Sequence, residues 1–183
     1  MKPLFLTLML AVLGAGCASQ NYTAASVSRT APLRRDAAVL VAMADDGQFG
    51  DDSYIGSGRA AAQVVSAAFS RQLTRVELTP DTGSLAQHLV RARGGRFDYL
   101  VIPRVLHPED RGTEWSGQPD QIKIEIRTVA VSTGDTVAEG VVSGKGKWFT
   151  MGSDAPEDLL KVPVNAYVKW LFSPEDTPVP VLK

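Results

Sequence analysis

The chain has 183 residues, of which 44% are hydrophobic and 21% charged, and its formal charge at pH 7 is −1. This composition excludes a disordered chain, which would be poorer in apolar residues and richer in net charge. Near-neutral charge argues against a nucleic-acid-binding protein, and a single cysteine excludes a disulfide-bonded scaffold. The length fits one domain with terminal extensions.

The first residues have the pattern of a signal peptide. Lys2 supplies a positive charge, and the apolar run from Leu4 to Leu13 follows it. Ten residues are too few to span a bilayer core of about 30 Å as a helix. Residues 1–16 are therefore predicted to be a signal peptide that is removed on export.

The lone cysteine follows this segment directly. The sequence Leu13-Gly14-Ala15-Gly16-Cys17 resembles the lipobox of bacterial lipoproteins. This resemblance implies that Cys17 becomes the first mature residue and carries acyl chains such as palmitate, which together anchor the protein stably. By the sorting rule of such lipoproteins, the non-acidic Ala18 implies an outer-membrane anchor facing the periplasm of the cell envelope. The alternative is an ordinary secretory peptide that leaves a free thiol at Cys17.

Composition divides the mature chain into three parts. Residues 17–35 are small and polar without periodicity, which predicts a lipidated tether. Arg29, Arg34 and Arg35 are interpreted as charges of a solvated linker, with contact to anionic lipid headgroups as the alternative. Residues 36–172 are predicted to form the folded domain, and the Pro-rich residues 173–183 a C-terminal tail.

The first half of the domain predicts strands alternating with helices. A buried strand is expected at 39–44, followed by a Gly/Asp/Ser-rich loop at 45–58. A helix at 57–73 has apolar residues at intervals of three and four, and Val76 and Leu78 mark a short strand. Ser84 and Gln87 form a capping box for a second helix, which ends at Gly94 and Gly95.

The second half predicts an antiparallel hairpin and a helical end. A strand is expected at 99–106, with Pro103 at an edge or bulge. The alternation from Ile122 to Arg127 predicts a strand with one solvated face, joined by the turn 132–135 to a strand at 136–148. A helical region follows Asp154, which Pro163 is expected to interrupt before a last helix at 164–171.

The expected fold is α/β, bordering on α+β. It is a single mixed sheet of about five strands with helices packed against it, in the order β-α-β-α-β-β-β-α.

Several phrases of the sequence occur together in a known family. They are Asp46–Gly50, Tyr54–Gly58, Asp98–Pro103, Leu106–Gly117, Lys147-Trp148 and Asn165–Val168. Together they resemble a family of Gram-negative envelope lipoproteins known only as a domain of unknown function. The resemblance extends from about Asp36 to Phe172. It implies a compartment but no activity, since the family has none assigned.

The densest cluster of polar residues follows the strand at 99–106. Its members define a candidate recognition surface: Arg104, His107, Glu109, Asp110, Arg111, Glu114, Trp115 and Ser116. Trp and Arg are enriched at binding hot spots. The simpler interpretation is an ordered loop, in which Arg104 and Arg111 pair with the carboxylates and Trp115 packs on the domain.

Two enzymatic alternatives centre on His107. A metal site would use His107 with Glu109, Asp110 or Glu114, but H-E-x-x-H spacing is absent. A hydrolase would use His107 as general base, but no serine has the G-x-S-x-G spacing of a nucleophile. No catalytic, metal or cofactor residue is therefore assigned.

Two further positions have simple interpretations. Ser57 and Gly58 open a helix and are expected to cap it, with a weak anion site as the alternative. His88 lies mid-helix and is interpreted as a surface or packing residue. The function expected from the sequence is a non-enzymatic, membrane-anchored module that binds an envelope protein or a cell-wall component, and not nucleic acid.

Overall fold

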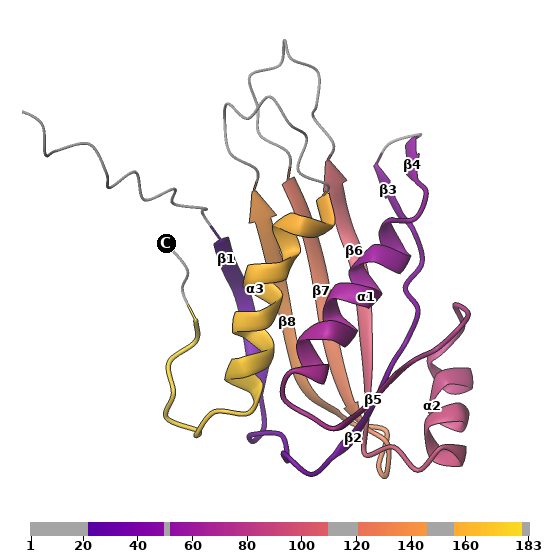
Figure 1. The fold of residues 1–183 in the computed structure, drawn as a ribbon, viewed down its shortest axis with the longest axis vertical. Coiled ribbons are helices and arrows are strands. Elements are labelled where there is room, and N and C mark those ends of the chain that lie inside the picture. Colours follow the sequence, from indigo (N-terminus) through magenta and orange to yellow (C-terminus); the bar gives the residue numbers. More distant parts are fainter. Residues whose placement is uncertain (1–21, 50–51, 110–120, 146–155, 181–183) are drawn as a thin grey trace, which may run out of the picture.

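The computed structural model describes residues 22–49, 52–109, 121–145 and 156–180. These residues form a six-stranded mixed sheet, a two-stranded hairpin and three helices (Figure 1). In chain order the elements are β1 (Tyr22–Arg29), β2 (Ala38–Val41), β3 (Gly47–Phe49), β4 (Asp52–Tyr54), α1 (Ser57–Ser70), β5 (Arg75–Leu78), α2 (Leu85–Gly94), β6 (Tyr99–Glu109), β7 (Gln121–Ala130), β8 (Thr136–Lys145) and α3 (Pro156–Leu171).

The sheet combines a parallel part and an antiparallel part. Its strand order is β1-β8-β7-β6-β2-β5. Strand β2 is parallel to β5 and β6, and α1 and α2 supply the crossovers between these three strands. Strands β6, β7, β8 and β1 pair antiparallel. The predicted mixed sheet with helices packed on it is confirmed, with six strands where about five were expected.

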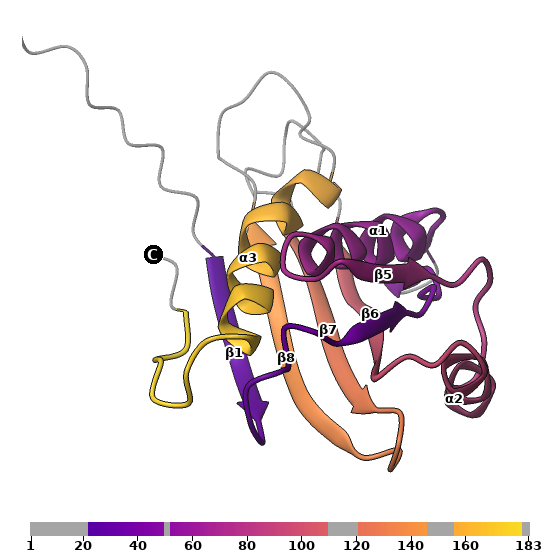
Figure 2. The ribbon, with the colours of Figure 1, turned by 60° about the horizontal axis from the view of Figure 1, so that its bottom comes forward.

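Helices α1 and α3 cover one face of the sheet (Figure 2). The alternation of β7 directs Ile122, Ile124 and Ile126 into this interface, where all three are buried. Tyr167 of α3 and Phe69 of α1 have no exposed surface and fill the space between helices and sheet. This is the main hydrophobic core, and we call this side of the sheet the covered face.

Helix α2 lies on the opposite side, apart from α1 and α3 (Figure 2). It packs with Phe97 and Ala92 against a second, smaller cluster that includes Leu40, Leu100 and Val129. Within the described residues, no helix packs on the rest of this side. We call the part of this side formed by the middle of β6, β7 and β8 the uncovered face.

The described strand β1 lies within the stretch for which the sequence predicts a tether. It pairs antiparallel with β8, and Leu33, which follows it, is 5% exposed in the main core. The prediction of a tether is therefore corrected for residues 22–35, which belong to the folded domain. Small polar residues without alternation give no strand signal, and the pairing of β1 with β8 at the sheet edge is a relation between distant segments.

The predicted loop at 45–58 is also corrected, since it contains the β3–β4 hairpin. Its residues are rich in Gly, Asp and Ser, which are depleted in strands. The hairpin lies against β6 beyond the point where β2 stops pairing. It has only three residues on each side, so tertiary contacts with β6 are its main support.

Helix α3 runs through Pro163 without interruption, contrary to the prediction. Proline lacks the N–H that would bond the carbonyl four residues back, here that of Leu159. This carbonyl packs instead on Gly144 of β8, where an added Cβ would lie 2.3 Å from the Leu159 oxygen. Pro163 thus lies inside a helix that packs closely on the sheet at Gly144.

Pro103 lies where the sequence predicts an edge or a bulge. Strand β2 pairs with β6 only as far as Val101, so the side of β6 at Pro103 needs no N–H for the ladder with β2. A register shift between Val105 and His107 follows. Strand β6 lies between β7 and β2 in the sheet, so Pro103 is not on an edge strand, and the register shift comes two residues after it.

The first part of the C-terminal tail is ordered against α3. The indole N–H of Trp170 donates to the carbonyl of Thr177 at 3.0 Å, and Val179 packs against the main core. The described part of the predicted tail therefore turns back against the helix, with the N–H of Thr177 donating to the carbonyl of Pro174.

Candidate functional site

Arg104 connects the predicted recognition surface to the uncovered face. Its side chain is 67% exposed on β6, and its Nε lies 2.9 Å from Glu125 Oε2 on β7. The sequence favours partners for Arg104 in the segment 109–114. The register of β6 with β7 instead places Glu125 directly opposite it. The pairing is across strands rather than along the chain.

Glu125 is the centre of a wider ionic network. Arg127 Nη2 lies 3.8 Å from Glu125 Oε1 and 3.4 Å from Glu139 Oε1 on β8. Arg127 and Glu139 are register partners, so the network of Arg104, Glu125, Arg127 and Glu139 extends over three strands. We call these four residues the charge ladder. It arranges two positive and two negative groups in fixed positions on the uncovered face.

The two carboxyl groups of the ladder differ in acidity. Burial raises the pKa of Glu125 above its usual value, and its hydrogen bond with Glu139 adds to this, against the opposing effect of Arg104 and Arg127. The hydrogen bond with Glu125 lowers the pKa of Glu139, and the Arg127 guanidinium lowers it further. The burial of Glu125 and its contact with Glu139 thus move the pKa values of the two carboxyl groups in opposite directions.

The other predicted residues of the recognition surface are only partly placed. His107 and Glu109 are described as backbone positions of β6, opposite Lys123 and Gln121 of β7. Asp110, Arg111, Glu114, Trp115 and Ser116 lie outside the described residues. The structure therefore brings Arg104 together with Glu125 and leaves the grouping of the remaining seven residues as a prediction.

The sequence contains a signal for the charge ladder that a search for local polar clusters misses. Alternation along β7 predicts a solvated face with Lys123, Glu125 and Arg127. This alternation does not give the strand register. The register places Arg104 beside Glu125 and Glu139 beside Arg127. Cross-strand partners far apart in sequence require the tertiary structure.

The start of α1 is satisfied by the protein itself. The backbone N–H of Gly58 donates to Asp46 Oδ1 at 2.9 Å, and Ser57 Oγ accepts from the N–H of Gly47 at 2.9 Å. The expected cap by Ser57 is corrected, because Gly56 occupies the N-cap position without a side-chain cap. With the Asp46 carboxylate at this helix end, the predicted weak anion site already holds an internal anion.

His88 is a packing residue of α2. It is 4% exposed, and its Nε2 has no hydrogen-bond partner in the described structure. Burial lowers the pKa of His88 below 6.5, and Arg91 lowers it further, against weaker effects of the Gly83 backbone and Asp45. The neutral imidazole is thus the form that the fold favours.

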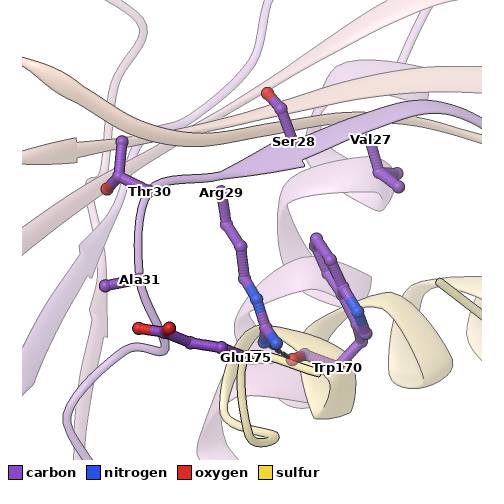
Figure 3. Close-up of a pocket in the computed structure, with 7 residues that line it drawn as sticks. All are labelled: Val27, Ser28, Arg29, Thr30, Ala31, Trp170 and Glu175. Carbon is purple, nitrogen blue, oxygen red and sulfur yellow. Dashed lines mark hydrogen bonds between the residues drawn. The ribbon is translucent and has the colours of Figure 1, made fainter. Parts of the chain in front are cut away.

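A shallow recess lies between β1 and the end of α3 (Figure 3). Arg29 occupies it, with its guanidinium 4.2 Å from the centre of the Trp170 ring. It donates to the carbonyl of Trp170 and, at 2.5 Å, to that of Pro174. A cation at the carbonyl end of a helix is stabilising. Arg29 therefore fastens β1 to α3, where the sequence favours a solvated linker charge.

The described residues contain no group of three or more His, Cys, Asp or Glu side chains that could hold a metal ion. No helix in the described ranges is long and apolar enough to cross a membrane. These ranges omit 110–120, which includes most of the predicted recognition surface.

Solved structures of PelC share this fold at low sequence identity. PelC from Paraburkholderia phytofirmans, described as a dodecamer, has a TM-score of 0.59 and 15% identity, covering 82% of this chain and 99% of that one. A single-residue variant of PelC has a TM-score of 0.61 and 14% identity, covering 84% of this chain and 96% of that one. Protein XCC0632 from Xanthomonas campestris has a TM-score of 0.49 and 13% identity, covering 78% of this chain and 85% of that one. At such identities the likeness concerns the fold alone.

Family membership follows from the sequence itself. No curated protein matches the chain. A family model matches residues 31–171, close to the range 36–172 of the predicted resemblance, and its description assigns no activity. The resemblance to a family known only as a domain of unknown function is thereby confirmed. The chain belongs to the family described as domain of unknown function (DUF4823).

Proposed function

We propose that this protein is a lipid-anchored, non-enzymatic binding or assembly module of the cell envelope. Its anchor is Cys17, acylated after removal of residues 1–16, in the outer membrane and facing the periplasm. The lipobox-like sequence at this cysteine supports the anchor. Detection of the acylated Cys17 peptide by mass spectrometry tests this part, and an unmodified thiol at the mature N-terminus contradicts it.

The observation that carries the binding role is the charge ladder on the uncovered face. Arg104, Arg127 and Glu139 have side chains 67%, 42% and 37% exposed, so their outer atoms are accessible to a partner. The cross-strand contacts hold these groups in place, which reduces the entropy lost when a partner binds. Lys123, half-buried on the same side of β7, adds a further positive charge.

The partner is an envelope protein or a cell-wall component. Its recognition rests on the arrangement of charges rather than on net charge, because the four ladder residues sum to zero. The fold relative PelC is described as a dodecamer, so a second copy of this chain is one candidate protein partner. The other residues of the predicted recognition surface, from His107 to Ser116, follow Arg104 in the sequence.

Pull-down from crosslinked envelopes tests the binding role. The wild-type protein is expected to retain a discrete partner that Arg104→Glu loses. The matched control is the exchange of both charges, Arg104→Glu with Glu125→Arg, which retains an attractive cross-strand pair but reverses its direction. Loss in both variants supports recognition of charge position. Equal recovery of the same partner by all three proteins contradicts a role for the ladder.

A further inference from the structure

The strand directions bring several chain segments to one end of the sheet. Strand β1 begins at Tyr22, which is paired with Gly144 near the end of β8. Strand β8 ends opposite the start of β7, and the start of β7 lies opposite the end of β6 at Glu109. We call this the anchored end, because β1 enters it from the side of Cys17. Figure 1 shows it at the top, and the turn between β7 and β8 lies at the opposite end.

The length of chain before β1 limits how far this end can move from the membrane. Cys17 precedes Tyr22 by five residues. Five residues reach at most about 17 Å when fully extended. The ten residues of β7 span about 34 Å at ~3.4 Å each. If the domain stood upright with the anchored end away from the membrane, the connection from Cys17 would need to be about twice as long as five residues allow.

The most exposed large apolar side chain of the described residues lies toward the same end. Ile55 is 91% exposed in the turn between β4 and α1. Tyr54, which precedes Ile55, pairs with Gly47 of β3, and β3 lies against β6 beyond the point where β2 stops pairing. Tyr54 beside it is half-buried, and the side chain of Arg59 in the first turn of α1 is exposed. An aliphatic, an aromatic and a cationic side chain together are typical of a membrane interface.

The arginines that the sequence offered as headgroup contacts lie near the other end. Arg29 pairs with Ala138 and contacts Trp170, and Arg34 bonds Asp98 Oδ1 at 2.7 Å, just before β6 begins. Arg35 lies over the ring of Phe172 at 5.8 Å. All three are engaged within the domain. They give no reason for the far end to approach lipid.

We propose that the anchored end rests on the lipid surface, with the strands upright and Ile55 at the lipid–water interface. This rests on the proposed acylation of Cys17. A single exposed isoleucine is common on soluble proteins. Ile55 is informative here because it lies toward the same end of the sheet as the short connection to Cys17. Asp45 is also exposed toward this end, so contact with lipid does not depend on anionic headgroups. The uncovered face then stands at a steep angle to the membrane and is open to the periplasm.

Fluorescence quenching in vesicles tests this orientation. The full lipidated protein carries no thiol besides the acylated Cys17, so Ile55→Cys and Ser132→Cys each place a fluorophore at one position. Both side chains are exposed, and Ser132 lies in the turn at the far end. The vesicles contain phosphatidylethanolamine, phosphatidylglycerol and a lipid with a nitroxide headgroup. We expect quenching at 55 at least about threefold above that at 132, given ends ~34 Å apart.

Two results overturn the proposal in distinguishable ways. Protein that floats with the vesicles but is quenched equally at both positions, or more at 132, retains its anchor and refutes the orientation. Protein that does not float refutes the anchor, and the orientation with it. Circular dichroism spectra matching that of the unsubstituted protein verify that both labelled variants are folded.

Discussion

Ile124 and Glu125 are neighbours in β7, yet they belong to different environments. Ile124 points into the covered face and has no exposed surface, whereas the side chain of Glu125 is 14% exposed within the charge ladder. One face is packed by α1 and α3, and the other carries ordered charges without a helix over it in the described structure. The comparison teaches that a single strand can serve the stability of the fold with one side and offer recognition with the other.

The largest contrast is expected from substitutions on the two sides of β7. Ile124→Ala removes buried apolar volume and should lower the free energy of unfolding by about 2–5 kcal/mol. Lys123→Ala, one residue earlier and on the other side, should change it by less than about 0.5 kcal/mol. Urea denaturation followed by circular dichroism measures both. Similar losses for the two variants would contradict the assignment of the faces.

Substitution of a glycine in the covered face should lower the free energy of unfolding nearly as much as Ile124→Ala. Gly144→Ala places a methyl group 2.3 Å from the Leu159 carbonyl oxygen, so α3 must shift, at a cost of about 1–3 kcal/mol. Gly94, at the end of α2, has no neighbour within 4 Å of an added Cβ. Gly94→Ala should raise stability by up to about 1 kcal/mol. Opposite signs in thermal denaturation are the expected result, and destabilisation by Gly94→Ala alone would contradict it.

The charge ladder should contribute little to folding. Arg104 is largely exposed, and exposed ion pairs couple by about 0–1 kcal/mol. A double-mutant cycle with Arg104→Ala and Glu125→Ala should therefore give a coupling energy below about 1 kcal/mol. Such a value, combined with loss of partner binding, separates recognition from stability. A coupling of several kcal/mol would mean that the ladder serves the fold instead.

The smallest effect concerns His88, which belongs to neither face of β7. Because burial lowers its pKa below 6.5, the unfolded chain takes up the proton before the folded protein does. Its contribution to stability is complete above about pH 6.5 and falls as the pH decreases toward the pKa of the folded state. His88→Leu should flatten the stability profile between pH 7 and 5. Parallel profiles for the two proteins would refute this.

Elements with a strong period were predictable from the sequence. The alternation in β7, the apolar stripe of α1 and the capping box of Ser84 with Gln87 all appear as expected. In each case the local pattern and the tertiary structure agree, because the same residues supply both the propensity and the buried face.

Elements held by tertiary contacts were not predictable in this way. Strand β1 has no apolar period and exists through pairing with β8. Helix α3 continues through Pro163 and packs closely on Gly144 of β8. Arg104 meets Glu125 only when the register of β6 with β7 is known. These are relations between distant segments, which no local pattern contains.

The central claim is that the uncovered face binds an envelope partner, and photo-crosslinking in living cells tests it most directly. A photoreactive amino acid replaces Lys123 on the uncovered side of β7 or, as a matched control, Gln63, which is exposed on α1. The account predicts a discrete crosslinked product from position 123 and none from position 63. A product from position 63 with none from position 123 would contradict it.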